Sequence, residues 1–233
     1  MKQVYAVLIF GLMWLYPTPC HSSETPRRAS FTSDNRSVSY EVFEGTAEGP
    51  VLILLHGASG PDVSLYRSQA QYFTTKGYTV LLLHYFDATG SSAPSSRNYN
   101  SWVKAVQALV RQCGNDPIWS KRKIALIGYS LGASVALGAG SQGIPVSAIA
   151  DWYGSLPDEF FYRFQGMPPL LILHGAQDAN IPVVNAQQLI KLCLLKGLTC
   201  ENHLYPDQGH GFTGNALEDA DNRTVDFFAR KLQ

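Results

Sequence analysis

The stretch Gly128-Tyr129-Ser130-Leu131-Gly132 constrains the fold of this chain more than any other. A strand-like apolar segment over residues 123–127 precedes it, and a helix-like run of small residues over 133–140 follows it. The pentapeptide alone could be a chance match, but a strand that turns sharply into a helix at Gly-x-Ser-x-Gly is a nucleophile elbow. Such a turn pushes the serine hydroxyl out of the sheet and aims the first N–H groups of the helix at charge forming beside it. Ser130 is therefore our candidate nucleophile.

Strand-like and helix-like segments alternate along the chain. The apolar runs at 51–55 and 170–174 are typical of strands buried on both faces. Further strands are predicted over 38–43 (as an edge strand), 78–86, 123–129, 146–153 and 199–205, and helices over 65–76, 102–113, 183–196 and 217–232. This alternation predicts an α/β fold, a mostly parallel sheet with helices on both faces, whose ligands bind at the carboxyl ends of the strands.

A serine hydroxyl needs a general base, and the base needs a third group to orient it. In an elbow-containing sheet of this kind the three occur in the order Ser, Asp or Glu, His. Asp178 follows the predicted strand 170–174, and His210 follows the strand 199–205. Both should lie on the same rim as Ser130, so we predict that His210 is the general base and that Asp178 orients it.

Other acids and histidines compete for these roles. Asp151, near the end of its strand, is another acid that could orient the base. Asp207 is close to His210 in sequence, but aspartate is a common turn residue, so we expect it to shape the turn. His203 is expected to face outward from its strand, and His84 either lines the site or only caps its strand, the second being the interpretation we favour.

A tetrahedral oxyanion needs two backbone donors. One is predicted to be the N–H of Leu131, the residue after the nucleophile. The other should come from the loop after the first buried strand, where Ala58 follows His56-Gly57. Ala58 and Leu131 are therefore the predicted oxyanion hole.

The N-terminus has the composition of a secretory signal peptide. Lys2 precedes an apolar run of about a dozen residues and then smaller residues, which predicts a signal over 1–22 and a secreted or periplasmic protein. A buried first helix and a lipid anchor on Cys20 are the alternatives. Residues 23–37 are polar and are predicted to be a flexible lead-in to one domain over 38–233.

Composition excludes several partners. Lys plus Arg and Asp plus Glu number 18 each, so we expect no nucleic acid or anionic membrane surface as partner, and no membrane span in the mature chain. No Cys/His spacing resembles a metal site, and no cofactor is expected. Beyond the signal, three cysteines allow at most one intramolecular disulfide; either Cys193 pairs with Cys200 or no disulfide forms.

Six short motifs are spread along the chain: His56-Gly57, Tyr85-Phe86, Gly128 to Gly132, Tyr153-Gly154, His174-Gly175-Ala176-Gln177-Asp178 and Gly209-His210-Gly211-Phe212. On these motifs the chain resembles the dienelactone hydrolase family of α/β hydrolases. The resemblance implies an α/β-hydrolase fold and a Ser130–His210–Asp178 triad. Founding members of that family carry a cysteine at the Ser130 position and a glutamate in the 56–58 loop. The resemblance therefore implies a serine esterase on that scaffold, without the thiolate mechanism of the founding members.

We therefore expect hydrolysis of a small carboxylic ester or lactone through an acyl-enzyme on Ser130. The connection over 154–168 is too short for a large lid, which favours small, soluble acyl groups. Three alternatives stay open: a serine peptidase of the prolyl-oligopeptidase type, an acyltransferase, and a non-catalytic binding protein on a hydrolase scaffold.

Overall fold

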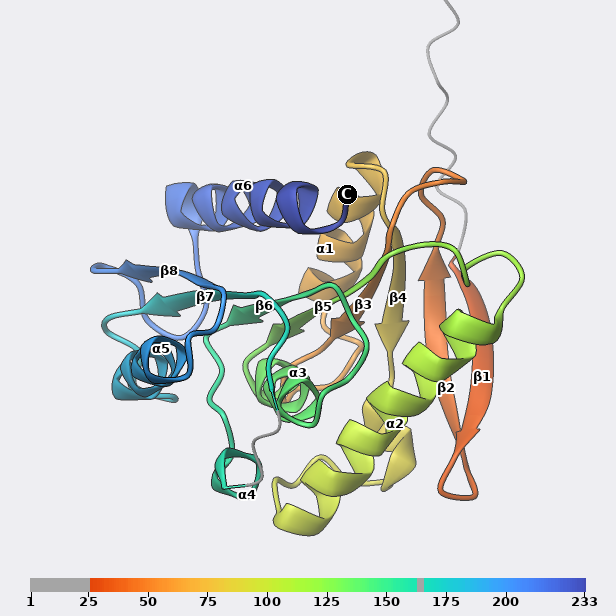
Figure 1. The fold of residues 1–233 in the computed structure, drawn as a ribbon, viewed down its shortest axis with the longest axis horizontal. Helices are drawn as coiled ribbons and strands as arrows, with labels where there is room; N and C mark the ends of the chain where they lie inside the picture. Colours follow the sequence, from red (N-terminus) through yellow and green to blue (C-terminus); the bar gives the residue numbers. More distant parts are fainter. Residues whose placement is uncertain (1–25, 163–165) are drawn as a thin grey trace, which may run out of the picture.

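The computed structural model describes residues 26–162 and 166–233 (Figure 1). The predicted signal peptide over 1–22 lies outside these ranges. The strands are β1 (Arg27–Ser33), β2 (Arg36–Phe43), β3 (Val51–Leu55), β4 (Thr79–Leu83), β5 (Ile124–Tyr129), β6 (Ala148–Trp152), β7 (Leu170–Gly175) and β8 (Cys200–Tyr205). The helices are α1 (Ser64–Thr75), a 3₁₀ turn η1 (Tyr85–Ala88), α2 (Ser96–Asn115), α3 (Leu131–Ser141), α4 (Asp158–Phe161), α5 (Val184–Lys196) and α6 (Gly214–Lys231).

The strands form one mixed sheet in the order β1-β2-β4-β3-β5-β6-β7-β8. The neighbours from β4 to β8 pair in parallel, and β2 runs antiparallel to both β1 and β4. The predicted α/β architecture with a mostly parallel sheet is confirmed. Because β5, β7 and β8 run in the same direction, the loops that follow them meet at one edge of the sheet.

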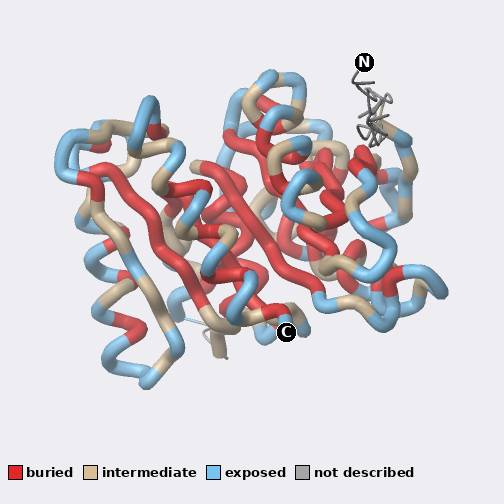
Figure 2. Tube along the Cα trace, turned by 90° about the horizontal axis from the view of Figure 1, so that it is seen from above, coloured by how far each residue is buried: buried red, intermediate tan, exposed pale blue. Residues whose placement is uncertain are grey.

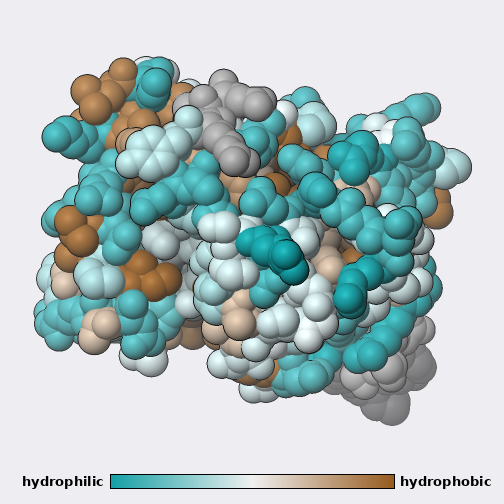
Figure 3. Space-filling model, turned by 90° about the horizontal axis from the view of Figure 1, so that it is seen from below, coloured by the Kyte–Doolittle hydropathy of each residue, from teal (hydrophilic) through white to brown (hydrophobic). Residues whose placement is uncertain are grey.

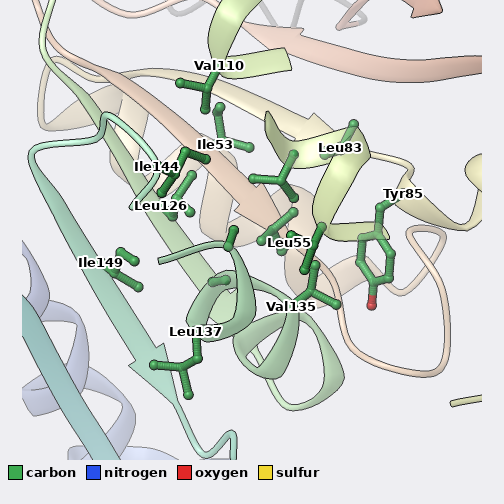
Figure 4. Close-up of a cluster of buried hydrophobic side chains, with 14 of the residues drawn as sticks. Ile53, Leu55, Leu83, Tyr85, Val110, Leu126, Val135, Leu137, Ile144 and Ile149 are labelled. Atoms are coloured by element: carbon green, nitrogen blue, oxygen red, sulfur yellow. The ribbon is translucent and has the colours of Figure 1, made fainter. Parts of the chain in front are cut away.

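Helices cover both faces of the sheet (Figure 1). Buried side chains of α2, α3 and α5 pack on one face, and those of α1 and α6 on the other. Figure 2 shows the inner strands as buried tubes between helices whose outer sides are exposed, and the two edge strands, β1 and β8, are more exposed. Figure 4 shows Ile53, Leu55 and Leu126 of the sheet in one buried cluster with Val135 and Leu137 of α3. These apolar contacts fix α3, and hence the turn before it, against the sheet.

The lead-in expected over 23–37 is wrong where the structure describes it. Residues 27–33 form β1, which pairs with β2 along its whole length. Asp34 and Asn35 both have positive φ values, 45° and 62°, as a tight two-residue hairpin turn requires. The expectation that the strand 38–43 lies at the edge of the sheet is also wrong, because β1 pairs with the outer side of β2. The Asp-Asn pair followed by an alternating segment was the local signal for this hairpin.

The face seen from below mixes hydrophilic and hydrophobic residues, with the hydrophobic ones in separate patches (Figure 3). Within the described residues, no helix is both long and apolar enough to span a bilayer. Cys193 near the end of α5 and Cys200 at the start of β8 form a disulfide, the pairing that the sequence left open. Cys113 is a free, buried cysteine.

Candidate active site

Ser130 lies in a strained turn between β5 and α3. Its φ is +55° and its ψ is −119°, a conformation that costs energy for any residue other than glycine. The turn fits only because two neighbours lack side chains. A Cβ on Gly128 would lie 2.4 Å from the Ala133 Cα, and one on Gly132 would lie 2.2 Å from the Leu55 carbonyl oxygen. The elbow is therefore packed against its own helix and against β3.

The three residues predicted as a triad are joined by hydrogen bonds. The Ser130 Oγ lies 2.8 Å from the His210 Nε2, and the His210 Nδ1 lies 2.8 Å from the Asp178 Oδ2. A carboxylate oxygen accepts the Nδ1 proton, which leaves the Nε2 lone pair to accept the Ser130 hydroxyl proton. The Asp178 side chain is fully buried, whereas the His210 side chain is about one-fifth exposed. This is the arrangement that general-base activation of a serine needs.

The loop after β7 fixes Asp178. Its Oδ1 accepts the N–H groups of Asn180 and Ile181, both at 2.8 Å. The His174 Nε2 donates to the Ile181 carbonyl at 2.8 Å and lies 3.4 Å from the Asp178 Oδ2. Burial lowers the pKa of His174, against a smaller opposing effect of the Ile181 hydrogen bond. A neutral His174 thus braces the acid loop, a positioning role that the sequence alone did not reveal.

Backbone contacts hold the acid loop, which follows β7 and carries Asp178, against the loop that follows β8 and carries His210. The Ala176 N–H donates to the Tyr205 carbonyl at 2.8 Å, and the Gln177 N–H donates to the Gln208 carbonyl at 2.9 Å. A Cβ on Gly175 would lie 2.3 Å from the Gly209 carbonyl oxygen. The glycine after His174 is therefore required by the close approach of these two loops.

The loop after β3 passes beside Ser130. A Cβ on Gly57 would lie 3.5 Å from the Ser130 Cβ, and the Gly57 N–H donates to the Tyr66 hydroxyl at 2.9 Å. Neither the Ala58 N–H nor the Leu131 N–H donates to another described residue. Both predicted donors therefore have no acceptor among the described residues; Leu131 directly follows Ser130 in the chain, and Ala58 directly follows Gly57.

The competing residues lie elsewhere. The Asp151 Oδ1 accepts the Gly154 N–H at 2.8 Å and is not in the relay. The His84 Nε2 lies 3.1 Å from the Glu41 Oε1, consistent with the structural role we favoured for it. Asp207 is exposed in the turn after β8, and His203 is half-buried with its ring against Tyr205. Among the described residues, no group of three or more His, Cys, Asp or Glu side chains is arranged to hold a metal ion.

Residues 40–232 match the model of the dienelactone hydrolase family. The chain belongs to that family. Solved structures share the fold. One is the dienelactone hydrolase-like promiscuous phosphotriesterase P91 from metagenomic libraries, with a TM-score of 0.75 and 16% identity. The match covers 90% of this chain and 99% of that one. The Pyrococcus furiosus esterase Pf2001 has a TM-score of 0.72 and 18% identity, covering 90% and 92%.

Among curated proteins, the chain is similar to dipeptidyl aminopeptidase BIII of Pseudoxanthomonas mexicana. The two are 22% identical over 222 residues, which cover 72% of this chain and 31% of that protein. The chain spans about a third of the length of the curated relatives that it matches. Identity at this level, and the structural likenesses above, establish the dienelactone hydrolase fold but not a substrate.

Asp151 is a fully buried carboxyl directly beneath the elbow. In the sheet it pairs with Gly128, and a Cβ on Gly154 would lie 2.7 Å from its Oδ1. Its Oδ2 is buried and has no partner among the described residues. Burial raises the pKa of Asp151 to about 7, against a smaller opposing effect of the Gly154 hydrogen bond. The folded protein therefore holds this group as a neutral acid below about pH 7.

We expect Asp151→Asn to remove a pH dependence of stability. The unfolded carboxyl ionises near pH 4, so the wild type loses stability as pH rises from there through about 7. Between pH 5 and pH 8 that loss is roughly 3 kcal/mol. The amide keeps the acceptor for the Gly154 N–H and cannot ionise. Between pH 5 and pH 8 the free energy of unfolding of the variant should therefore rise by that amount relative to the wild type. Urea unfolding of both proteins at the two pH values measures the difference, and an equal gap at both would contradict the assignment.

Proposed function

We propose that this protein is a serine hydrolase that cleaves small carboxylic esters or lactones through an acyl-enzyme on Ser130. One observation carries the proposal: the unbroken relay from the Ser130 hydroxyl through His210 to the buried Asp178, with 2.8 Å at each step. The strained elbow and the two free N–H groups beside it add to this support, because both serve acyl transfer.

The reaction follows from the protonation states. As the Ser130 Oγ attacks the ester carbonyl carbon, its proton moves to the His210 Nε2, and Asp178 stabilises the resulting imidazolium. The carbonyl oxygen becomes negative beside the N–H groups of Ala58 and Leu131. Collapse breaks the bond to the leaving oxygen, which takes the proton from His210. Water then repeats the steps on the acyl-enzyme, releasing the acid and restoring the Ser130 hydroxyl.

We infer that the serine makes this chain an esterase on a scaffold whose founding members use cysteine. A hydroxyl is not acidic enough to ionise alone near neutral pH, so it depends on the His210 contact throughout the cycle. Short, soluble acyl groups fit best. The connection between β6 and β7 contributes only the four-residue helix α4 within its described part, and such a connection supports an open cleft.

Covalent labelling tests the proposal directly. A fluorophosphonate should modify the wild-type protein at Ser130, identified by peptide mass, and a panel of 4-nitrophenyl esters should show the highest kcat/KM for short acyl chains. No labelling together with no ester turnover would favour the non-catalytic binding protein. Added alcohols that divert the acyl group from water would favour an acyltransferase.

A peptidase is the second candidate, because dipeptidyl aminopeptidase BIII matches 72% of this chain. The same relay would attack an amide carbonyl, with His210 protonating the leaving amine. Dipeptide and acyl-aminoacyl nitroanilides separate the two functions. We expect kcat/KM for these amides to be far below that for the short esters, and the reverse order would make the protein a peptidase.

We also propose that residues 1–22 direct export to the periplasm or the medium. The Cys193–Cys200 disulfide supports this, because structural disulfides persist in oxidising compartments. Expression of the full chain in a bacterial host, followed by N-terminal sequencing of the periplasmic product, should give a chain starting at Ser23. A full-length product retained in the cytoplasm would contradict the proposal.

A further inference from the structure

The phenol of Tyr66, on the first turn of α1, reaches the loop beside Ser130. Its oxygen accepts the Gly57 N–H at 2.9 Å. A Cβ on Gly57 would lie 2.7 Å from this oxygen and 3.5 Å from the Ser130 Cβ. The hydroxyl oxygen is therefore at most about 6 Å from the Ser130 Cβ. At that distance it can contact the carbonyl oxygen of an ester whose carbonyl carbon the Ser130 Oγ has attacked.

The surroundings of Tyr66 hold it in this position. The side chain is only 6% exposed, and its ring contacts the rings of Tyr129 and His56 at centroid distances of 5.7 and 6.1 Å. Its oxygen uses a lone pair for Gly57, which leaves the hydroxyl proton without an acceptor among the described residues. Burial raises the pKa of Tyr66, against a smaller opposing effect of the Gly57 hydrogen bond, so the proton stays on at neutral pH.

We propose that the Tyr66 hydroxyl is a third donor to the oxyanion, beside the N–H groups of Ala58 and Leu131. This inference rests on the proposed esterase function. A buried donor with an unused proton gains most when negative charge develops next to it, because little water competes for the contact. The same hydroxyl accepts the Gly57 N–H, so it also fixes the loop that carries the Ala58 donor.

The first test replaces the hydroxyl with hydrogen. Tyr66→Phe should lower kcat for 4-nitrophenyl esters by about 100-fold, the effect of removing one oxyanion donor, with KM changed little. Tyr78→Phe is the matched control, because Tyr78 is buried in the same core cluster but precedes β4 at the opposite end of the parallel strands. A kcat for Tyr66→Phe within threefold of the wild type would overturn the proposal.

A second variant separates donation from loop positioning and keeps the hydroxyl. Fluorotyrosine incorporated at position 66 is a stronger donor and a weaker acceptor than tyrosine. If the hydroxyl donates to the oxyanion, kcat should rise as ring fluorination makes the phenol more acidic, at a pH where it remains protonated. If Tyr66 only accepts the Gly57 N–H, kcat should fall, which would overturn the proposal.

Failure of this inference is distinguishable from failure of the proposed function. Wild-type turnover that disappears in Ser130→Ala, combined with an unchanged Tyr66→Phe, would remove only the role of Tyr66. Turnover that persists in Ser130→Ala would remove the esterase assignment itself. The rate of fluorophosphonate labelling should also fall in Tyr66→Phe, because the phosphoryl oxygen occupies the oxyanion position.

Discussion

Ser130→Ala is expected to lower the turnover of short 4-nitrophenyl esters by at least about 10⁴-fold and to abolish fluorophosphonate labelling. Without the Oγ there is no atom to form the acyl-enzyme, and His210 has no hydroxyl to activate. The backbone donors remain, so substrate binding should persist. Initial rates at saturating ester measure the effect. The protein is first separated from host esterases on two successive columns.

Ser141→Ala is the matched control for that substitution. Ser141 is a buried serine at the last position of α3, and its Oγ donates to the Gly138 carbonyl within the helix. Its loss should change kcat by less than threefold. Residual activity in Ser130→Ala above one-tenth of the wild-type value would mean that another group is the nucleophile.

Gly132→Ala is expected to prevent stable folding or to lower the melting temperature by more than about 10 °C. The added Cβ would lie 2.2 Å from the Leu55 carbonyl oxygen and 2.4 Å from that of His56. These are backbone atoms of β3 and the loop after it, so relief requires α3 to move away from the sheet. Such a movement would break the elbow and open the core beneath it. Thermal unfolding followed by circular dichroism, or the fraction of soluble protein on expression, measures the effect.

Gly114→Ala is the control for the alanine substitution itself. Gly114 lies within α2, and a Cβ there would meet no atom within 4 Å. This change should stabilise the protein by about 0.5–1 kcal/mol, because alanine is the better helix former. A Gly132→Ala protein as stable as the wild type would show that α3 can shift without cost.

Much of the candidate site follows from local sequence. Ser130, Asp178 and His210 each come just after a strand-like segment, and the strands that precede them are parallel. Parallel strands end at a common edge, so the order of these residues along the chain predicts that they meet, with Asp151 as a competing acid. The hydrogen bonds at 2.8 Å are consistent with that prediction.

Other features depend on contacts that no local pattern specifies. Tyr66 reaches Gly57 because α1 packs on one face of the sheet, and His174 braces Ile181 across a turn of the acid loop. The strand β1 was missed because an exposed, polar strand has little apolar alternation, and its pairing with β2 supplies the missing stabilisation. The contacts of Tyr66 and His174 could not be read from spacing, whereas the Asp34-Asn35 turn was a local signal for the β1–β2 pairing.

The sequence by itself determined the parallel sheet, the elbow and the order of the three residues, because hydrophobic periodicity and glycine positions act over a few residues. Only the tertiary structure decided which acid faces His210. Asp151 and Asp178 both come near strand ends, but the pleat turns Asp151 under α3 toward Gly154, while the loop after β7 delivers Asp178 to the imidazole. That choice depends on which face of the sheet a side chain points to, and it is fixed only when the helices pack.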